Sequence, residues 1–205
     1  MIELKAKNLT RYFEQRCVFK DLNFDLNKGN VLVILGKNGS GKTTLLRILA
    51  GILSPSKGEV RYALNGDGLK GARLQKVISL VAPDLNLYDE LTALENLMFL
   101  SKVQGFDLKE KDMIEKMDQV GLEKRASDLL GSFSSGMKQR LKYVSALIKE
   151  PLVLLLDEPK ANLDEEGILF LEKVVQDQKQ RGILIWATSN KEEKEYGDQI
   201  LQLDE

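Results

Sequence analysis

The sequence contains no histidine and a single cysteine among its 205 residues. Without histidine the chain lacks the commonest metal ligand of proteins and their commonest general base at neutral pH, so any catalysis must rest on carboxylates, lysine, hydroxyl groups and a bound metal. Because Cys17 has no second cysteine to pair with, an intrachain disulfide and a cysteine-rich metal site are excluded, and a reducing compartment is expected.

Long apolar runs and an excess of one charge are also missing. No apolar stretch approaches the length of a membrane span, and the first residues lack the long apolar region of a secretory signal. The 30 basic and 31 acidic residues give a formal net charge of −1, which provides no overall attraction to nucleic acid or to an anionic membrane. We therefore expect a soluble, cytoplasmic protein whose residues 1–205 form one domain with a substantial core.

Continuous apolar segments alternate with helical patterns along much of the chain. Runs at 31–35, 77–81, 152–156 and 182–187 are typical of buried strands, and helical spacing follows the first run and fills 167–180. Strand–helix–strand units with continuous apolar strands predict a parallel sheet covered on both faces.

Two other regions differ in character. Residues 2–6, 17–19 and 22–26 predict a small antiparallel sheet, with Tyr12 and Phe13 in a polar loop. From about 91 to 148 helical periodicities dominate, which predicts an all-helical insertion. The predicted fold class is α/β. It has a mixed, mainly parallel sheet, an N-terminal antiparallel β subdomain and a helical subdomain (85–148) inserted into a core formed by 1–84 and 149–205.

A glycine-rich stretch links the first buried strand to the first helix. It consists of Gly36, Lys37, Asn38, Gly39, Ser40, Gly41, Lys42, Thr43 and Thr44. The pattern of two glycines followed by Lys and Thr allows backbone N–H groups to converge on phosphate oxygens, with Lys42 reaching the β- and γ-phosphates and the Thr43 hydroxyl on Mg²⁺. A plain Gly/Ser turn is the alternative, which the strand–loop–helix context disfavours.

Two carboxylates, Asp157 and Glu158, end the buried run at 152–156. Parallel sheets place their ligands at such strand ends. Next to a phosphate loop, Asp157 can hold Mg²⁺ through water, and Glu158 can orient or deprotonate the water that attacks the γ-phosphate. A solvated acidic turn is the alternative, and the upstream glycine loop makes it the weaker one.

Small residues precede a predicted helix at 132–136. The helix start behind Ser134, Ser135 and Gly136 can bind an anion, although such a sequence taken alone is more often a simple helix cap.

These motifs resemble, nearly end to end and in the same order, those of the nucleotide-binding subunit of an ATP-binding-cassette (ABC) transporter. Residues 36–44 resemble the Walker A loop, 133–137 the LSGGQ signature, 152–158 the Walker B strand with its catalytic glutamate, and 161–164 the D-loop. Asp84 stands at the position of the Q-loop glutamine, and Phe13 at that of the adenine-stacking aromatic.

The resemblance implies ATP and Mg²⁺ as cofactors and a head-to-tail dimer in which the signature helix of one subunit caps ATP held by the other. It implies nucleotide contacts from Phe13, Gly36, Asn38, Gly39, Ser40, Gly41, Lys42, Thr43, Thr44, Ser134, Ser135 and Gly136. Thr43, Asp84 and Asp157 are the implied metal-site residues, and Glu158, Lys42 and Ser189 the catalytic ones. The implied partners are a second ATPase subunit, in a homodimer or heterodimer, and a separately encoded transmembrane subunit at the inner face of the cell membrane, with no nucleic acid.

The chain departs from the family pattern at several of these positions. Ser189 replaces the switch histidine; it can donate one hydrogen bond but carries no charge, which predicts slow rather than absent hydrolysis. Asp84 replaces a neutral glutamine near the metal and adds a negative charge whose effect is open in direction. Ser135 and Met137 replace a glycine and the glutamine of the signature and add bulk where phosphate must approach closely.

The leading functional hypothesis is therefore an ATPase subunit that powers a membrane transporter through nucleotide-driven dimerisation. The run at 91–97 is reminiscent of haem-exporter subunits. The alternative is a weakly hydrolysing, nucleotide-gated interaction module without a transport role, which the missing histidine favours and Glu158 disfavours. A nucleic-acid-linked ATPase is disfavoured by the balanced charge, the absence of a long coiled coil and the single cassette.

Overall fold

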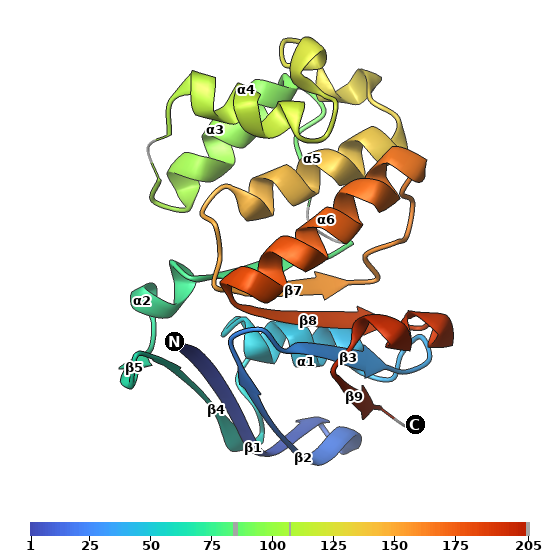
Figure 1. Ribbon diagram of the computed structural model, residues 1–205. Coiled ribbons are helices and arrows are strands. Elements are labelled where there is room, and N and C mark those ends of the chain that lie inside the picture. The colour runs from blue at the N-terminus through green and yellow to red at the C-terminus, as the bar shows by residue number, and fades with distance from the viewer. Residues whose placement is uncertain (84–85, 107, 204–205) are drawn as a thin grey trace. The chain divides into compact units, whose positions relative to one another are not determined.

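The strands of this protein form two sheets in the computed structural model, which describes residues 1–83, 86–106 and 108–203 (Figure 1). The first sheet has the order β2-β1-β4-β5 and contains β1 (Ile2–Phe13), β2 (Arg16–Asn27), β4 (Lys57–Leu64) and β5 (Asp67–Leu69). The second has the order β6-β7-β8-β3-β9 and contains β3 (Val31–Leu35), β6 (Ile78–Val81), β7 (Val153–Asp157), β8 (Ile183–Thr188) and β9 (Gln199–Gln202).

Antiparallel and parallel strand pairings occur in different sheets. The described pairings of the first sheet are antiparallel, and those of the second are parallel. Every residue of β3, β7 and β8 is buried. Since successive side chains of a strand point to opposite faces, these central strands are covered on both sides. The predicted fold class is confirmed.

By compactness the chain divides into two units. One comprises residues 1–82, 151–159 and 175–205, and the other comprises residues 83–150 and 160–174. The second unit therefore includes the beginning of α6 (Glu165–Arg181), in addition to the segment 85–148 that the sequence assigns to a helical subdomain. The boundaries assigned from the sequence stay a prediction.

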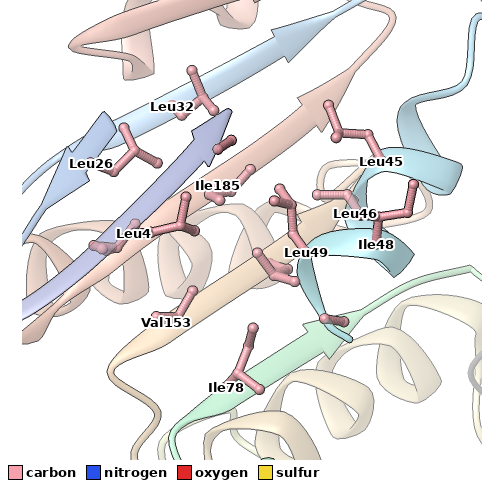
Figure 2. Packing of buried hydrophobic residues seen from close by; sticks show 14 of the residues in the cluster. Leu4, Leu26, Leu32, Leu45, Leu46, Ile48, Leu49, Ile78, Val153 and Ile185 are labelled. Carbon is pink, nitrogen blue, oxygen red and sulfur yellow. The ribbon is translucent and has the colours of Figure 1, made fainter. Parts of the chain in front are cut away.

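In the first unit one hydrophobic core joins both sheets to helix α1 (Lys42–Leu49). The helix contributes Leu45, Leu46, Ile48 and Leu49 to this core (Figure 2). Its partners include Leu4 and Leu26 of the antiparallel sheet and Leu32, Ile34, Val153 and Ile185 of the parallel sheet. Short elements α2 (Ala72–Gln75) and η3 (Lys191–Tyr196) complete this unit.

The hairpin β1–β2 differs from the sequence-based expectation. Two twelve-residue strands replace the predicted short ones, and Tyr12 and Phe13 lie at the end of β1, paired with Cys17 and Arg16, rather than in a loop. Irregularities in the pairing between Ala6 and Tyr12 break the alternation of apolar and polar residues, so the long strands could not be read from the pattern.

The second unit is mainly helical. It contains α3 (Ala93–Val103), α4 (Glu110–Asp118), η1 (Glu123–Arg125), η2 (Leu130–Ser132) and α5 (Ser135–Leu147), together with the start of α6. A capping box begins α3: the Glu95 N–H donates to Thr92 Oγ1 (3.1 Å), and the Thr92 N–H donates to Glu95 Oε2 (2.8 Å). The hydrogen bond from the Thr92 backbone N–H, and secondly one from the Thr92 side chain, lower the pKa of the Glu95 carboxyl below its ordinary value. Within the described residues, no helix combines the length and apolar character needed to cross a membrane.

Trp186, the single tryptophan, lies fully buried in β8. Its indole Nε1–H donates to Glu193 Oε2 (2.8 Å), and its ring stacks on Tyr196 with 4.6 Å between ring centroids. These contacts tie η3 to β8, the strand that leads into Ser189.

Candidate functional site

The glycine-rich loop connects β3 to α1 and depends on two of its glycines. Gly41 has φ +98°, and a Cβ atom there would collide with the side chain of Val18. At Gly36 a Cβ atom would meet the side chain of Ser40 and would lie 2.9 Å from the carbonyl oxygen of Leu203. A side chain at either position would therefore displace the loop from this conformation.

The beginning of α1 has the features of an anion site. Gly41, its N-cap, provides no side-chain cap, and the first turn contains no acidic residue. Ser40 Oγ is buried and has no hydrogen-bond partner among the described residues. Unpaired N–H groups, the positive end of the helix dipole and an unsatisfied hydroxyl together fit a phosphate group.

Lys42 bends back over this loop from the first residue of α1. Its ammonium Nζ donates to the carbonyl oxygens of Gly36 (2.7 Å) and Lys37 (3.0 Å) and lies 3.2 Å from Glu158 Oε1. The side chain is only 6% exposed. The loop thus holds a desolvated positive charge next to the carboxylate that ends β7.

Thr43 and Asp157 are brought together across 114 residues of sequence. The Thr43 hydroxyl donates to Asp157 Oδ2 at 2.5 Å, and Asp157 is buried. A hydroxyl and a carboxylate beside a phosphate loop are the oxygen ligands that Mg²⁺ takes in nucleotide sites, where phosphates and water complete the shell. Consistent with this division, no group of three or more acidic or cysteine side chains within the described residues could hold a metal by itself.

Glu158 follows Asp157 in a left-handed conformation with φ +47°, which is uncommon for a non-glycine residue. Its N–H donates to the carbonyl of Ala187 (2.8 Å), which fixes it to the end of β8. Glu158 Oε2 accepts from the Ser189 N–H (3.2 Å) and lies 3.4 Å from the hydroxyls of Ser189 and Thr188. The structure thus places Ser189 and Glu158 side by side. Thr188 is not among the residues predicted from the sequence, although a polar residue that ends a buried strand at the same edge is a signal that could have identified it.

Phe13 and the signature residues lie elsewhere on the chain. The Phe13 ring is 47% exposed, and the guanidinium of Arg11 covers it at 4.4 Å from the ring centroid. In the helical unit Ser134 is the N-cap of α5, and its hydroxyl accepts from the Met137 N–H (3.2 Å), so the capping interpretation of this serine holds. Ser135 is exposed and Gly136 is buried. Asp84 lies outside the described residues.

The parallel sheet, the phosphate loop at the N-terminus of α1 and the paired carboxylates at the end of β7 in the same sheet define the class of P-loop nucleotide-binding proteins. The chain belongs to the ABC transporter family, whose model matches residues 19–161. It is an ATP-binding subunit of that family, as the motif order predicts.

Two named proteins and one solved structure illustrate what the chain is similar to. An uncharacterised ABC transporter ATP-binding protein of Bacillus subtilis, YybJ, is 34% identical over 93% of this chain and 86% of its own. HrtA of Staphylococcus haemolyticus, named as a putative hemin import ATP-binding protein, is 34% identical over 98% and 96%. A dimeric ATP-binding cassette solved with ADP and Pi after hydrolysis covers 98% of this chain and 94% of its own with a TM-score of 0.82; at 24% identity this likeness shows the fold.

Proposed function

We propose that this ABC ATPase subunit binds Mg-ATP between the 36–44 loop and the end of β7, hydrolyses it, and thereby powers a transporter. The observation that supports this most strongly is the pair of contacts Lys42–Glu158 and Thr43–Asp157, which join the loop to the two carboxylates. Both pairs lie within one compact unit, and each joins one buried side chain, Lys42 or Asp157, to a half-buried one.

Each residue of this arrangement has a separate task in the proposal. Lys42 and the N–H groups at the start of α1 hold the β- and γ-phosphates, with the Ser40 hydroxyl as an additional donor. Thr43 and Asp157 hold the metal, which neutralises phosphate charge when bound. Glu158 orients the attacking water and accepts its proton. Phe13 stacks on the adenine at the end of β1. Asn38, Gly39 and Thr44 complete the cradle, and Asp84 is a further metal-site residue.

A second subunit completes the site in the proposal. Ser134, Ser135 and Gly136 at the start of α5 face the γ-phosphate of ATP held by the other subunit. That a solved cassette of the same fold is dimeric supports the presence of a second subunit. The dimer is docked on a separately encoded membrane subunit at the inner face of the membrane. A haem-related cargo stays a prediction, which the name of the Staphylococcus haemolyticus relative supports.

Turnover is proposed to be slow because Ser189 stands beside Glu158. The Ser189 hydroxyl is 3.4 Å from Glu158 Oε2, beyond the usual range of an O–H···O hydrogen bond, and it has no positive charge to direct at a phosphate. The firmer contact is the Ser189 backbone N–H, which any residue would supply.

Calorimetric titration with Mg-ATP and a phosphate-release assay test the proposal. Lys42→Ala should weaken binding by about tenfold or more, because it removes a charge-assisted contact worth roughly 1.5–3 kcal/mol. Glu158→Gln should bind ATP but release phosphate at least about a hundredfold more slowly. As a matched control, Lys116→Gln breaks the Lys116–Glu150 ion pair (3.8 Å) in the helical unit and should change neither quantity. Absence of Mg-ATP binding, or phosphate release that both site variants leave intact, would overturn the assignment.

A further inference from the structure

Arg140 is a buried arginine in the second turn of α5, one turn after signature residue Gly136. Its Nη1 donates to Glu166 Oε2 (2.6 Å) and to the carbonyl of Val120 (2.8 Å), and its Nη2 donates to Asp164 Oδ2 (3.2 Å). The side chain is 8% exposed. All of these partners belong to the helical unit. Arg140 therefore joins the start of α5 to the segment that begins α6.

Asp164 connects this arginine to the signature. Its Oδ1 accepts from the Gly167 N–H (2.9 Å) and so caps the start of α6. Its Oδ2 lies 3.0 Å from the position that a Cβ atom of Gly136 would occupy. One carboxylate thus contacts the backbone of the signature, the start of the next helix and Arg140.

This contact has an electrostatic cost if the signature must approach a nucleotide. The carboxylate of Asp164 lies against Gly136, and Glu166 adds a second negative charge to the same cluster. Uncompensated, both would oppose a phosphate at the start of α5 and would weaken the attraction of the helix dipole. Arg140 pairs with both carboxylates from within the unit. Its own side chain is buried, whereas those of Asp164 and Glu166 are 45% and 76% exposed, so water weakens the pairs and the buried guanidinium is the least screened of the three charges.

We propose that Arg140 is a positioning residue for ATP held by the other subunit: it fixes Asp164 against Gly136 and offsets the negative charge behind the signature. The inference rests on the proposed function, because it needs a signature that acts on the partner's nucleotide. It predicts that replacing Arg140 lowers the rate of ATP hydrolysis by the dimer. The monomeric chain should still bind Mg-ATP through Lys42 with unchanged affinity.

A charge-compensation cycle separates this role from simple loss of packing. Arg140→Gln should lower kcat about fivefold, the size expected for one charge near a helix N-terminus, with Mg-ATP affinity of the separate chain unchanged. Asp164→Asn keeps an N-cap for α6 but removes the charge, so the double variant Arg140→Gln/Asp164→Asn should regain most of the lost kcat. Arg140→Lys keeps the charge and should lose less than Arg140→Gln. If Arg140→Gln does not fold in a thermal melt, Arg140→Met, which also removes the charge, replaces it throughout. Lys116→Gln is again the control for loss of an ion pair in this unit.

Mixed dimers show on which subunit's ATP the arginine acts. Two differently tagged forms of the chain are coexpressed, and dimers that carry both tags are isolated. In one dimer Lys42→Ala and Arg140→Gln lie on opposite chains, and in the other they lie on the same chain opposite a wild-type chain. With action on the partner's ATP, the opposite-chain dimer keeps one site with an intact loop and an intact signature, and should hydrolyse about fivefold faster than the same-chain dimer.

The outcomes are distinguishable from failure of the proposed function itself. The same-chain dimer hydrolysing as fast or faster would overturn action on the partner's nucleotide. A double variant no better than Arg140→Gln would overturn charge compensation. Wild-type chain that neither binds Mg-ATP nor releases phosphate would instead overturn the proposed function.

Discussion

The replacement Ser189→His measures how strongly the end of β8 limits hydrolysis. In the wild-type chain the Ser189 hydroxyl lies 3.4 Å from Glu158 Oε2, too far to contribute much. A charged imidazole in that place would donate a charge-assisted hydrogen bond to the γ-phosphate of bound ATP. Such a bond is worth about 1.5–3 kcal/mol, against about 1 kcal/mol for a hydrogen bond between neutral groups. A net gain of about 0.5–2 kcal/mol, realised in the transition state, corresponds to a kcat about 2- to 30-fold higher.

The assay is phosphate release at saturating Mg-ATP, at about pH 6 and about pH 8, on either side of the ordinary histidine pKa. Because the wild-type chain has no histidine, any new dependence on pH in this range belongs to the introduced side chain. Imidazole is charged below its pKa, so the gain should be present at the lower pH and shrink as the pH rises. Ser189→Ala is the matched control and should change kcat less than about twofold. A folded Ser189→His chain that binds Mg-ATP normally, yet turns over no faster at either pH, would refute the reasoning.

Three further predictions concern the supporting structure. Ser134→Ala removes the N-cap of α5 and should lower the free energy of unfolding by about 1 kcal/mol in urea titrations, whereas Ser134→Asp should not; equal stability of all three chains would contradict the capping role. Leu46→Ala, at a fully buried position of α1, should cost about 2–5 kcal/mol, and a loss under about 1 kcal/mol would mean that the core is not packed as described. In an NMR titration Glu95 should show a pKa below its ordinary value, and Thr92→Ala should return it only part of the way, because the substitution removes the side-chain hydrogen bond and keeps the backbone N–H that has the larger effect. Because the pKa of Glu95 is lower in the folded state than in the unfolded state, this carboxylate contributes to the free energy of unfolding above its unfolded pKa, and the contribution is lost as the pH falls through its folded pKa. An unchanged Glu95 pKa in Thr92→Ala would contradict the effect assigned to the Thr92 side chain.

Much of the parallel sheet could be predicted because its strands are buried on both faces. The runs around Val33, Leu154 and Ile185 are continuously apolar, a pattern that short helices and half-exposed strands do not share. The meeting of Thr43 with Asp157 also followed from sequence, since the carboxyl ends of the parallel strands of one sheet lie at the same edge.

Other features of the structure correspond to no pattern in the sequence that would predict them. The bulges that lengthen β1 and β2 depend on residues such as Asn8, which adopts a positive φ, and they break the alternation that marks a strand. Arg140 looks in sequence like any charged residue on a helix surface, and only the fold reveals that Asp164 and Glu166 enclose it. The compactness of 160–174 with the helical unit likewise depends on contacts made far along the chain.

The stacking of Trp186 on Tyr196 gives this protein an intrinsic optical probe. With one tryptophan in the chain, emission excited at the red edge of the absorption band comes from a single place, two residues before Thr188 and three before Ser189. Its hydrogen bond to Glu193 and its stacked tyrosine make the emission sensitive to movement of η3 against β8. Residues 83–150 contribute no tryptophan signal. A fluorescence titration can therefore follow events near Glu158 without labels, and separately from any rearrangement of the helical unit.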